Sequence, residues 1–325
     1  MSGLHIGVSG VGSIGLRHTR LLAELPGVAV TVFDSAPERL NLPPGVRLAP
    51  DFAALLAAGL DGLVVATPDA AHAEQSIAAC ERGIAVLVEK PVADSVAAAT
   101  EVARVAARTG VGVLVGYVLR HYRVLAQVRE LLADGAVGTP VSLHVTLGAY
   151  ETLRLARNRF RDEDRFRLPY DYSHEWDYLQ WLLGPITGVA AVARLAGDRP
   201  LRQDPNVIDG VLTLAGGATG TFHLDYVAEG VGRRLEVVGD RGALWADLTK
   251  GQVRVRAHAS SLASEYDCAE HRDEAFTRQL THFLDVVRGQ AEPLVNVADG
   301  VRALAVADAV VVACEQSGWA AVAAA

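Results

Sequence analysis

The sequence contains almost no lysine. Of its 30 basic residues, 28 are arginine and only Lys90 and Lys250 are lysine, so each of the two calls for an explanation. Cysteine is scarce as well. Cys80, Cys268 and Cys314 are far apart in the chain and form no Cys-x-x-Cys pair, which excludes a disulfide scaffold and a zinc knuckle. No other metal-ligand spacing is visible, and we therefore predict no bound metal.

Long apolar runs are also missing. The longest one near the end, residues 303–314, is interrupted by Asp308 and is too short to span a bilayer. The first residues enter a strand-like segment without the charged region and cleavage site of a secretion signal. The net charge of −8 argues against a nucleic-acid or anionic-membrane surface. We therefore expect a cytoplasmic protein with neither nucleic acid nor membrane as partner.

A chain of 325 residues, half of them hydrophobic, suits two domains of ordinary size. In residues 1–120, short runs rich in Val, Ile and Leu alternate with stretches of helical spacing. Strands without polar alternation predict a parallel sheet with both faces covered by helices. The runs that predict its strands are LHIGVSG, VAVTVFD, GLVVAT, IAVLVEK and VGVLVGY.

Residues 121–325 have a different pattern. After about residue 138, strand-like segments follow one another through glycine-containing turns, such as those at 216–218 and 240–242. Consecutive strands with tight turns predict a largely antiparallel sheet, and helical spacing recurs at 173–183, 274–288 and 297–316. The fold class is therefore α/β, with one domain over 1–120 and a second α/β domain over 121–325.

A glycine motif carries the first functional signal: Gly10-Val11-Gly12-Ser13-Ile14-Gly15 fits G-x-G-x-x-G between a strand and a helix. Asp34 ends the next strand, 19 residues after Gly15, at the spacing of a ribose-binding acid. Because its carboxylate would repel a 2′-phosphate, NAD is favoured over NADP. The alternative is a glycine-rich turn followed by an ordinary strand-terminal Asp.

Several further stretches resemble the glucose–fructose oxidoreductase / inositol 2-dehydrogenase (Gfo/Idh/MocA) family. The stretches are Ala66-Thr67-Pro68 with His72 downstream, Glu89-Lys90-Pro91, the run from Asp171 to Asp177, and residues 10–18, 115–124, 272–289 and 293–310. The resemblance implies that residues 1–120 form an NAD-binding Rossmann domain and that the second domain has an open-faced sheet. It implies that nicotinamide and substrate lie between the domains. It also implies a homodimer or homotetramer that packs through this sheet. The implied substrate is the secondary alcohol of a sugar or cyclitol.

Lys90 follows the apolar strand IAVLVE, at the edge of a parallel sheet where ligands bind. A compact ammonium there can donate to a substrate oxygen and stabilise a developing alkoxide. The alternative is a solvated lysine paired with Glu89. The resemblance places Thr67, Pro68, His72 and Glu89 beside the cofactor.

His174 lies in DYSHEWDYLQWLLG, whose apolar spacing predicts a helix. Asp171, His174 and Tyr178 would then share one face. A histidine can accept a hydroxyl proton as hydride leaves, and Asp171 could orient it or bind substrate. The alternatives are that Asp171 caps the helix and that His174 is a structural residue. The resemblance favours the catalytic assignment of both, because this position holds the family's proposed acid/base histidine.

Further pocket candidates are Tyr117, Arg120 and Tyr150. The family usually has a glycine-rich run just before the Asp, and this chain has RFRLPY at 165–170 instead. Six arginines crowd residues 154–167. One interpretation is a solvated charged loop. The other is that one or two of these arginines, Arg165 first, bind an anionic group of the substrate.

The sequence thus predicts an NAD(H)-dependent oxidoreductase acting on a sugar, aminosugar or cyclitol. Lys90 and His174 would contact the reacting oxygen. Three alternatives stay open. The first is a nucleotide-sugar or uronate dehydrogenase that uses the 154–167 arginines. The second is a non-redox NAD-dependent glycosidase, and the third is a regulator that binds dinucleotide without turnover.

Overall fold

The computed structural model describes residues 3–39, 41–155, 165–198, 200–201 and 203–323, and the chain divides into two units. The first unit comprises Met1–His121 and His271–Val301. The second comprises Tyr122–Glu270 and Arg302–Ala324. Helix α10 (Val297–Gln316) begins in the first unit and its remaining residues belong to the second.

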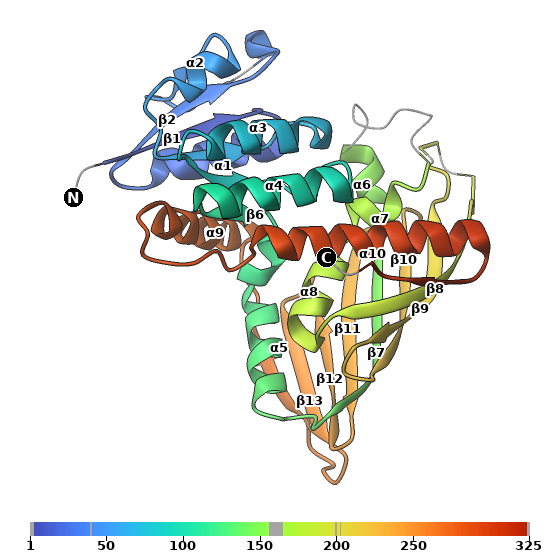
Figure 1. Cartoon of the computed structure of the whole chain (residues 1–325). Coiled ribbons are helices and arrows are strands. Elements are labelled where there is room, and N and C mark those ends of the chain that lie inside the picture. Colours follow the sequence, from blue (N-terminus) through green and yellow to red (C-terminus); the bar gives the residue numbers. More distant parts are fainter. Residues whose placement is uncertain (1–2, 40, 156–164, 199, 202, 324–325) are drawn as a thin grey trace. The chain divides into compact units, whose positions relative to one another are not determined.

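A six-stranded parallel sheet forms the centre of the first unit, in the order β3-β2-β1-β4-β5-β6. Figure 1 labels its strands β1, β2 and β6. All side chains of β4 and β5 are buried, as expected where helices cover both faces. The predicted Rossmann domain is confirmed. Its strands are β1 (Leu4–Ser9), β2 (Val28–Phe33), β3 (Arg47–Leu48), β4 (Gly62–Val65), β5 (Ala85–Val88) and β6 (Val113–Val115). Its helices are α1 (Ser13–Glu24), α2 (Phe52–Leu56), α3 (His72–Cys80), α4 (Val96–Thr109) and α9 (Arg272–Val287).

A nine-stranded sheet forms the second unit, in the order β14-β13-β12-β11-β7-β10-β9-β8-β15. Every neighbouring pair is antiparallel except β7 and β10, which confirms the largely antiparallel prediction. The strands are β7 (Pro140–Ala149), β8 (Ile186–Arg194), β9 (Val207–Leu214), β10 (Thr219–Asp225), β11 (Val231–Gly239), β12 (Gly242–Asp247), β13 (Gln252–Ala257), β14 (Ser264–Asp267) and β15 (Trp319–Ala321). The helices are α5 (Arg123–Ala133), α6 (Tyr150–Leu155), α7 (Leu168–Asp171) and α8 (Ser173–Leu183).

The two faces of this second sheet differ. On one face, Trp176 of α8 packs edge-on against Phe222 of β10, with ring centroids 5.2 Å apart. On the other face lie residues of the alternate parity, such as Asp209, Val211 and His223, which are only partly buried or exposed. This alternation is typical of an antiparallel sheet with one covered and one open face.

Helix α9 corrects the sequence-based division at residue 120, which assigned 271–301 to the second domain. Within the first unit α9 packs against α1 and β5. It also approaches β4 so closely that a Cβ on Gly62 would lie 2.9 Å from the rings and methyls of Phe283 and Val287. The segment returns to the first unit because its apolar face covers this sheet.

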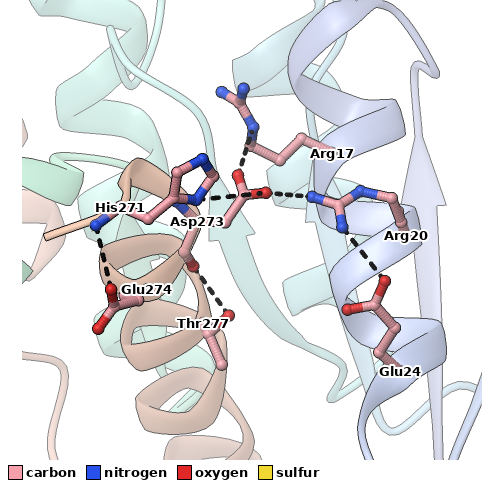
Figure 2. Close-up of polar contacts among 7 residues, drawn as sticks. All are labelled: Arg17, Arg20, Glu24, His271, Asp273, Glu274 and Thr277. Atoms are coloured by element: carbon pink, nitrogen blue, oxygen red, sulfur yellow. Dashed lines mark hydrogen bonds and ion pairs between the residues drawn. The ribbon is translucent and has the colours of Figure 1, made fainter.

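A polar cluster joins the start of α9 to α1 (Figure 2). The Asp273 carboxylate forms an ion pair with Arg17, whose Nε lies 3.0 Å from Oδ1, and accepts from the guanidinium of Arg20, which also binds Glu24 at 3.2 Å. The His271 side chain caps α9, and Glu274 accepts from the His271 backbone N–H at 3.0 Å. Asp273 is therefore the residue through which both arginines of α1 hold α9.

We predict that Asp273→Asn weakens the attachment of α9 to α1. Charge-assisted pairs at partly exposed positions contribute about 1 kcal/mol, so amides of α9 should exchange with solvent about fivefold faster. Hydrogen exchange measured by mass spectrometry checks this, with α8 amides as an internal reference. Glu24→Gln, at the exposed end of the cluster, should leave α9 exchange unchanged. Equal exchange in Asp273→Asn and the unaltered protein would contradict the assignment.

Candidate functional site

Polar residues follow the carboxyl ends of five neighbouring strands in the first unit. Gly10 follows β1, Asp34 follows β2, Thr67 follows β4, Glu89 follows β5 and Tyr117 follows β6. Because parallel strands end at the same edge of a sheet, these residues gather along one line. This edge is where ligands bind in open α/β sheets, and it is the candidate site of the first unit.

The glycine loop is tight on one side and open on the other. Gly10 has φ +83°, and a Cβ there would lie 2.7 Å from the backbone of Ala66 and Thr67. A Cβ on Gly15 would lie 1.8 Å from the Gly10 carbonyl oxygen, whereas one on Gly12 would meet nothing within 4 Å. Helix α1 begins at Ser13 without a side-chain cap or an acidic residue in its first turn. The loop and helix start therefore fit a dinucleotide diphosphate.

Asp34 lies against this loop. Its Oδ2 accepts from the Val11 N–H at 2.6 Å, and its Oδ1 accepts from the Ala36 N–H at 2.9 Å. The side chain is partly exposed, so the carboxylate keeps lone pairs directed away from these two bonds. A carboxylate fixed beside the glycine loop fits a ribose hydroxyl and repels a phosphate.

His72 joins the turn after β4 to the turn after β5. The imidazole is buried, with Nδ1 2.7 Å from the Pro91 carbonyl oxygen and Nε2 2.8 Å from the Thr67 carbonyl oxygen. Both ring nitrogens thus bind backbone rather than facing open space. The structure places His72 behind the Thr67-Pro68 and Lys90-Pro91 turns, where it sets their separation.

Lys90 is partly exposed at this edge, beside Glu89. Glu89 accepts from Nε2 of His18 at 2.7 Å, and His18 itself is fully buried in α1. The sequence reasoning missed His18. Helical spacing could have revealed it. His18 lies three residues after Gly15 and four before Leu22, and these positions share the buried face of α1.

Two other candidates of the first unit are buried. Tyr117 has no exposed surface. Arg120 donates to the Leu294 carbonyl at 3.1 Å and pairs with Asp299 at 3.2 Å. Leu294 lies between α9 and α10, and Asp299 is in the first turn of α10, so the contacts described for Arg120 hold the start of α10 in place.

In the second unit the helix is interrupted where the sequence predicted one continuous helix. Helix α7 ends at Asp171, Tyr172 has φ −99° and ψ 25°, and α8 begins at Ser173. The predicted shared helix face of Asp171, His174 and Tyr178 is therefore wrong: Asp171 lies on the preceding helix. The capping alternative for Asp171 is wrong as well, because the N-cap of α8 is Tyr172 and carries no side-chain cap.

The Asp171 carboxylate is held by two donors that the sequence did not reveal. Tyr226, just after β10, donates from its hydroxyl to Oδ2 at 2.6 Å, and Arg167 donates to Oδ1 at 3.4 Å. Burial, followed by the charge of Asp171, raises the pKa of Tyr226 well above its usual value, so the phenol remains a donor. No spacing rule links Tyr226 to Asp171, which lies 55 positions earlier. His174, three residues after Asp171, is partly exposed in α8.

The remaining candidates of the second unit lie near the arginine segment. Tyr150 is buried and its hydroxyl accepts from the Leu201 N–H at 3.2 Å. Arg165 is exposed, with its guanidinium 5.1 Å from the ring centroid of Phe166. Arg157, Arg159 and Arg161 lie outside the described residues.

The described part of the chain holds neither a membrane-spanning helix nor a metal-binding cluster. None of its helices is long and apolar enough to cross a membrane. Within the same residues, no group of three or more His, Cys, Asp or Glu side chains could hold a metal ion.

Comparison with known proteins agrees with these features. Residues 4–117 match the domain described as "Oxidoreductase family, NAD-binding Rossmann fold", and residues 125–245 match the "GFO/IDH/MocA C-terminal domain". The chain is 30% identical to inositol 2-dehydrogenase 1 of Saccharopolyspora erythraea, over 94% of this chain and 92% of that protein. It is 27% identical to the rhizopine catabolism protein MocA of Rhizobium meliloti, over 95% and 94%.

A solved structure shows the same fold. An oxidoreductase from Agrobacterium radiobacter, crystallised with NAD+, L-tartaric acid and magnesium, superimposes with a TM-score of 0.84 at 18% identity, over 99% of each chain.

We predict that Tyr226→Phe destabilises the second unit more than Tyr172→Phe. The two rings pack edge to face at 5.3 Å, but Tyr226 donates to a carboxylate, while the single hydroxyl proton of Tyr172 is shared between the carbonyls of Asp225 and Ala149. A bond to a charged group contributes about 2 kcal/mol and a neutral one about 1 kcal/mol. All 4 tryptophans lie in the second unit, so urea unfolding followed by tryptophan fluorescence reports on it. Equal losses would refute the assignment of Tyr226 as the anchor of Asp171.

Proposed function

The chain belongs to the Gfo/Idh/MocA family of NAD-binding oxidoreductases, and on that premise we propose that it is an NAD(H)-dependent dehydrogenase or reductase. Its substrate would be the secondary alcohol of a cyclitol, sugar or aminosugar, or the corresponding ketone. The observation that carries the proposal is the sheet edge of the first unit, where the open glycine loop and the Asp34 carboxylate stand in line with Lys90.

The proposed cofactor is NAD. Residues Gly10 to Gly15 and the start of α1 would hold its diphosphate, and Asp34 would accept from the ribose hydroxyls. Thr67, Pro68 and Glu89 would line the nicotinamide half, with His72 supporting their turns. The bound cofactor supplies acceptance or delivery of hydride, and the protein supplies orientation and charge.

Lys90 and His174 are the proposed catalytic residues. In the oxidising direction His174 would accept the hydroxyl proton, because an imidazole can take up a proton near neutral pH. Lys90 would donate to the same oxygen and stabilise the negative charge that develops there. Asp171, fixed by Tyr226 and Arg167, would bind substrate or orient His174. Tyr117, Arg120, Tyr150 and Arg165 remain weaker substrate-binding candidates.

The two lysines of the chain allow a matched test. Purified protein with NAD should produce NADH from at least one member of a panel of cyclitols, hexoses, aminosugars and uronic acids, and NADP should serve poorly. Lys90→Met should lower kcat by about two orders of magnitude, as loss of a donor to a developing oxyanion does. Lys250→Met should be unaffected, because Lys250 is exposed and pairs with Asp247 at 3.9 Å in a turn.

Other outcomes select other functions. Sugar release without net NADH would indicate the non-redox glycosidase, and NAD binding with no turnover of any substrate would indicate the regulator. A preference for uronic acids or nucleotide sugars that is lost in Arg165→Glu would favour the anionic-substrate dehydrogenase. If Lys90→Met and Lys250→Met were equally active, the role of Lys90 would be refuted.

We also infer a cytoplasmic location. Its support is the chemistry of the cysteines: Cys80, Cys268 and Cys314 are all free. Burial raises the pKa of Cys80 and of Cys314 to about 11, so both thiols stay protonated and unreactive at neutral pH. Free thiols are typical of a reducing compartment.

The open face of the nine-stranded sheet is proposed to bind a second copy of the chain, giving a homodimer or homotetramer. Three large apolar side chains on this face are exposed: Val192 at 66%, Val211 at 45% and Trp319 at 52%. They lie on neighbouring strands, because Ala190 of β8 pairs with both Val211 and Trp319. Grouped apolar side chains on a flat sheet face support self-association.

Val211→Glu should therefore lower the mass of the assembly. A carboxylate at the centre of a two-fold interface faces its own copy and loses its hydration, so we expect mainly monomer by light scattering after size exclusion. Leu262→Glu is the control, since Leu262 is 80% exposed but lies away from this face, between β13 and β14. An unchanged mass for Val211→Glu would rule out this face as the interface.

A further inference from the structure

His18 and Glu89 form a buried pair within the first unit. Nε2 of His18 donates to Oε1 of Glu89 at 2.7 Å; the His18 side chain is fully buried and that of Glu89 is 13% exposed. A carboxylate accepts but does not donate, so Nε2 carries the proton. The pair links α1, which begins at the glycine loop, to the residue that precedes Lys90.

The Glu89 carboxylate is confined on its other sides too. Oε2 accepts from the Lys90 N–H at 3.3 Å. A Cβ on Gly116 would lie 3.0 Å from both Cδ and Oε2 of Glu89, so the carboxylate packs directly on the Gly116 backbone. Glycine at 116 leaves the space, and His18 sets the direction in which the carboxylate points.

The charge of Glu89 depends on the same contacts. Burial alone would raise its pKa, but the His18 hydrogen bond and the charges of His18 and Lys90 outweigh burial and hold the pKa below its usual value. His18 and Lys90 are the titratable groups that act on this carboxylate. A buried carboxylate without such donors would be costly.

We propose that His18 is a positioning residue for Lys90: by donating to Glu89 it keeps an ionised carboxylate fixed beside the Lys90 ammonium. This rests on the proposed role of Lys90 in catalysis. His18 does not touch substrate, because its side chain has no exposed surface. Its other nitrogen, Nδ1, has no hydrogen-bond partner among the described residues, so the polar role of the ring resides in Nε2.

The competing explanation is that His18 merely fills space. Its ring packs edge-on against Phe276 of α9, with centroids 5.5 Å apart. If packing were its whole role, side chains of similar size would serve equally, whatever their hydrogen-bonding groups.

Two amide variants separate these explanations. The side-chain nitrogen of glutamine reaches about as far from the backbone as Nε2 of histidine, and that of asparagine only as far as Nδ1. His18→Gln therefore keeps a donor to Glu89, and His18→Asn loses it while remaining polar. Glu89→Asp tests the acceptor of the same hydrogen bond, because it keeps the charge but shortens the side chain by one methylene.

The readout is the titration of Lys90 in the protein without substrate. With only two lysines, labelling with 13C-lysine gives two Cε signals, and Lys250→Arg identifies the one from Lys90. A fixed carboxylate favours the charged ammonium, so we expect the Lys90 midpoint to fall by about half a pH unit or more in His18→Asn and Glu89→Asp. Glu89→Gln should produce the largest fall. His18→Gln should match the unaltered protein, and Lys250 should not move in any variant.

An unchanged Lys90 midpoint in both His18→Asn and Glu89→Asp would overturn the proposal, as would equal shifts in His18→Gln and His18→Asn. If His18→Asn does not fold, Glu89→Asp decides alone. With substrate, kcat of His18→Asn should fall about tenfold while His18→Gln retains it. The lysine titration needs no substrate, so a failure to find redox activity would count against the proposed function and leave the role of His18 to be decided separately.

Discussion

The parallel pairing of β1, β2, β4, β5 and β6 is the constraint on which the first unit depends. Parallel strands under helices on both faces are mostly apolar along their length, and the candidate functional residues stand at the strand ends. All five strands end at the same edge. A glycine loop, a carboxylate and an ammonium-bearing side chain can therefore stand in one line although 80 sequence positions separate Gly10 from Lys90.

Close backbone contacts at three glycines fix the loops along this edge of the sheet. Gly10 packs on the turn after β4, Gly15 packs on Gly10, and Gly116 packs on Glu89. At each of these positions a Cβ would occupy space that a neighbour already fills. The two buried histidines complete the arrangement: His72 joins backbone to backbone between two turns, and His18 joins a helix to a side chain.

Local patterns in the sequence were enough to predict much of the first unit. Strand-like runs, the G-x-G-x-x-G spacing and the position of Asp34 predict the Rossmann domain, because each depends on residues close in sequence. Helix α9 could not be assigned to its unit from the sequence, because helical spacing reveals an apolar face but not the sheet that it covers. The glycines at 62 and 112, against which its side chains pack, are far from α9 in the sequence. The break at Tyr172 was hidden because an uninterrupted apolar spacing spans two helices. Tyr226 was beyond prediction, because its bond to Asp171 depends on the tertiary path of β10.

The proposed role of Lys90 gives a reason for one of the two lysines in a chain that otherwise uses arginine. Glu89 offers one carboxylate, of which Oε1 already accepts from His18 and Oε2 accepts from the Lys90 backbone, and Gly116 closes off one side. A guanidinium brings a planar fork of five donors that requires matching acceptors, whereas an ammonium is compact and can share one crowded carboxylate. In a chain that uses arginine at 28 of its 30 basic positions, a lysine at position 90 is therefore what the proposed role beside Glu89 and the reacting oxygen requires.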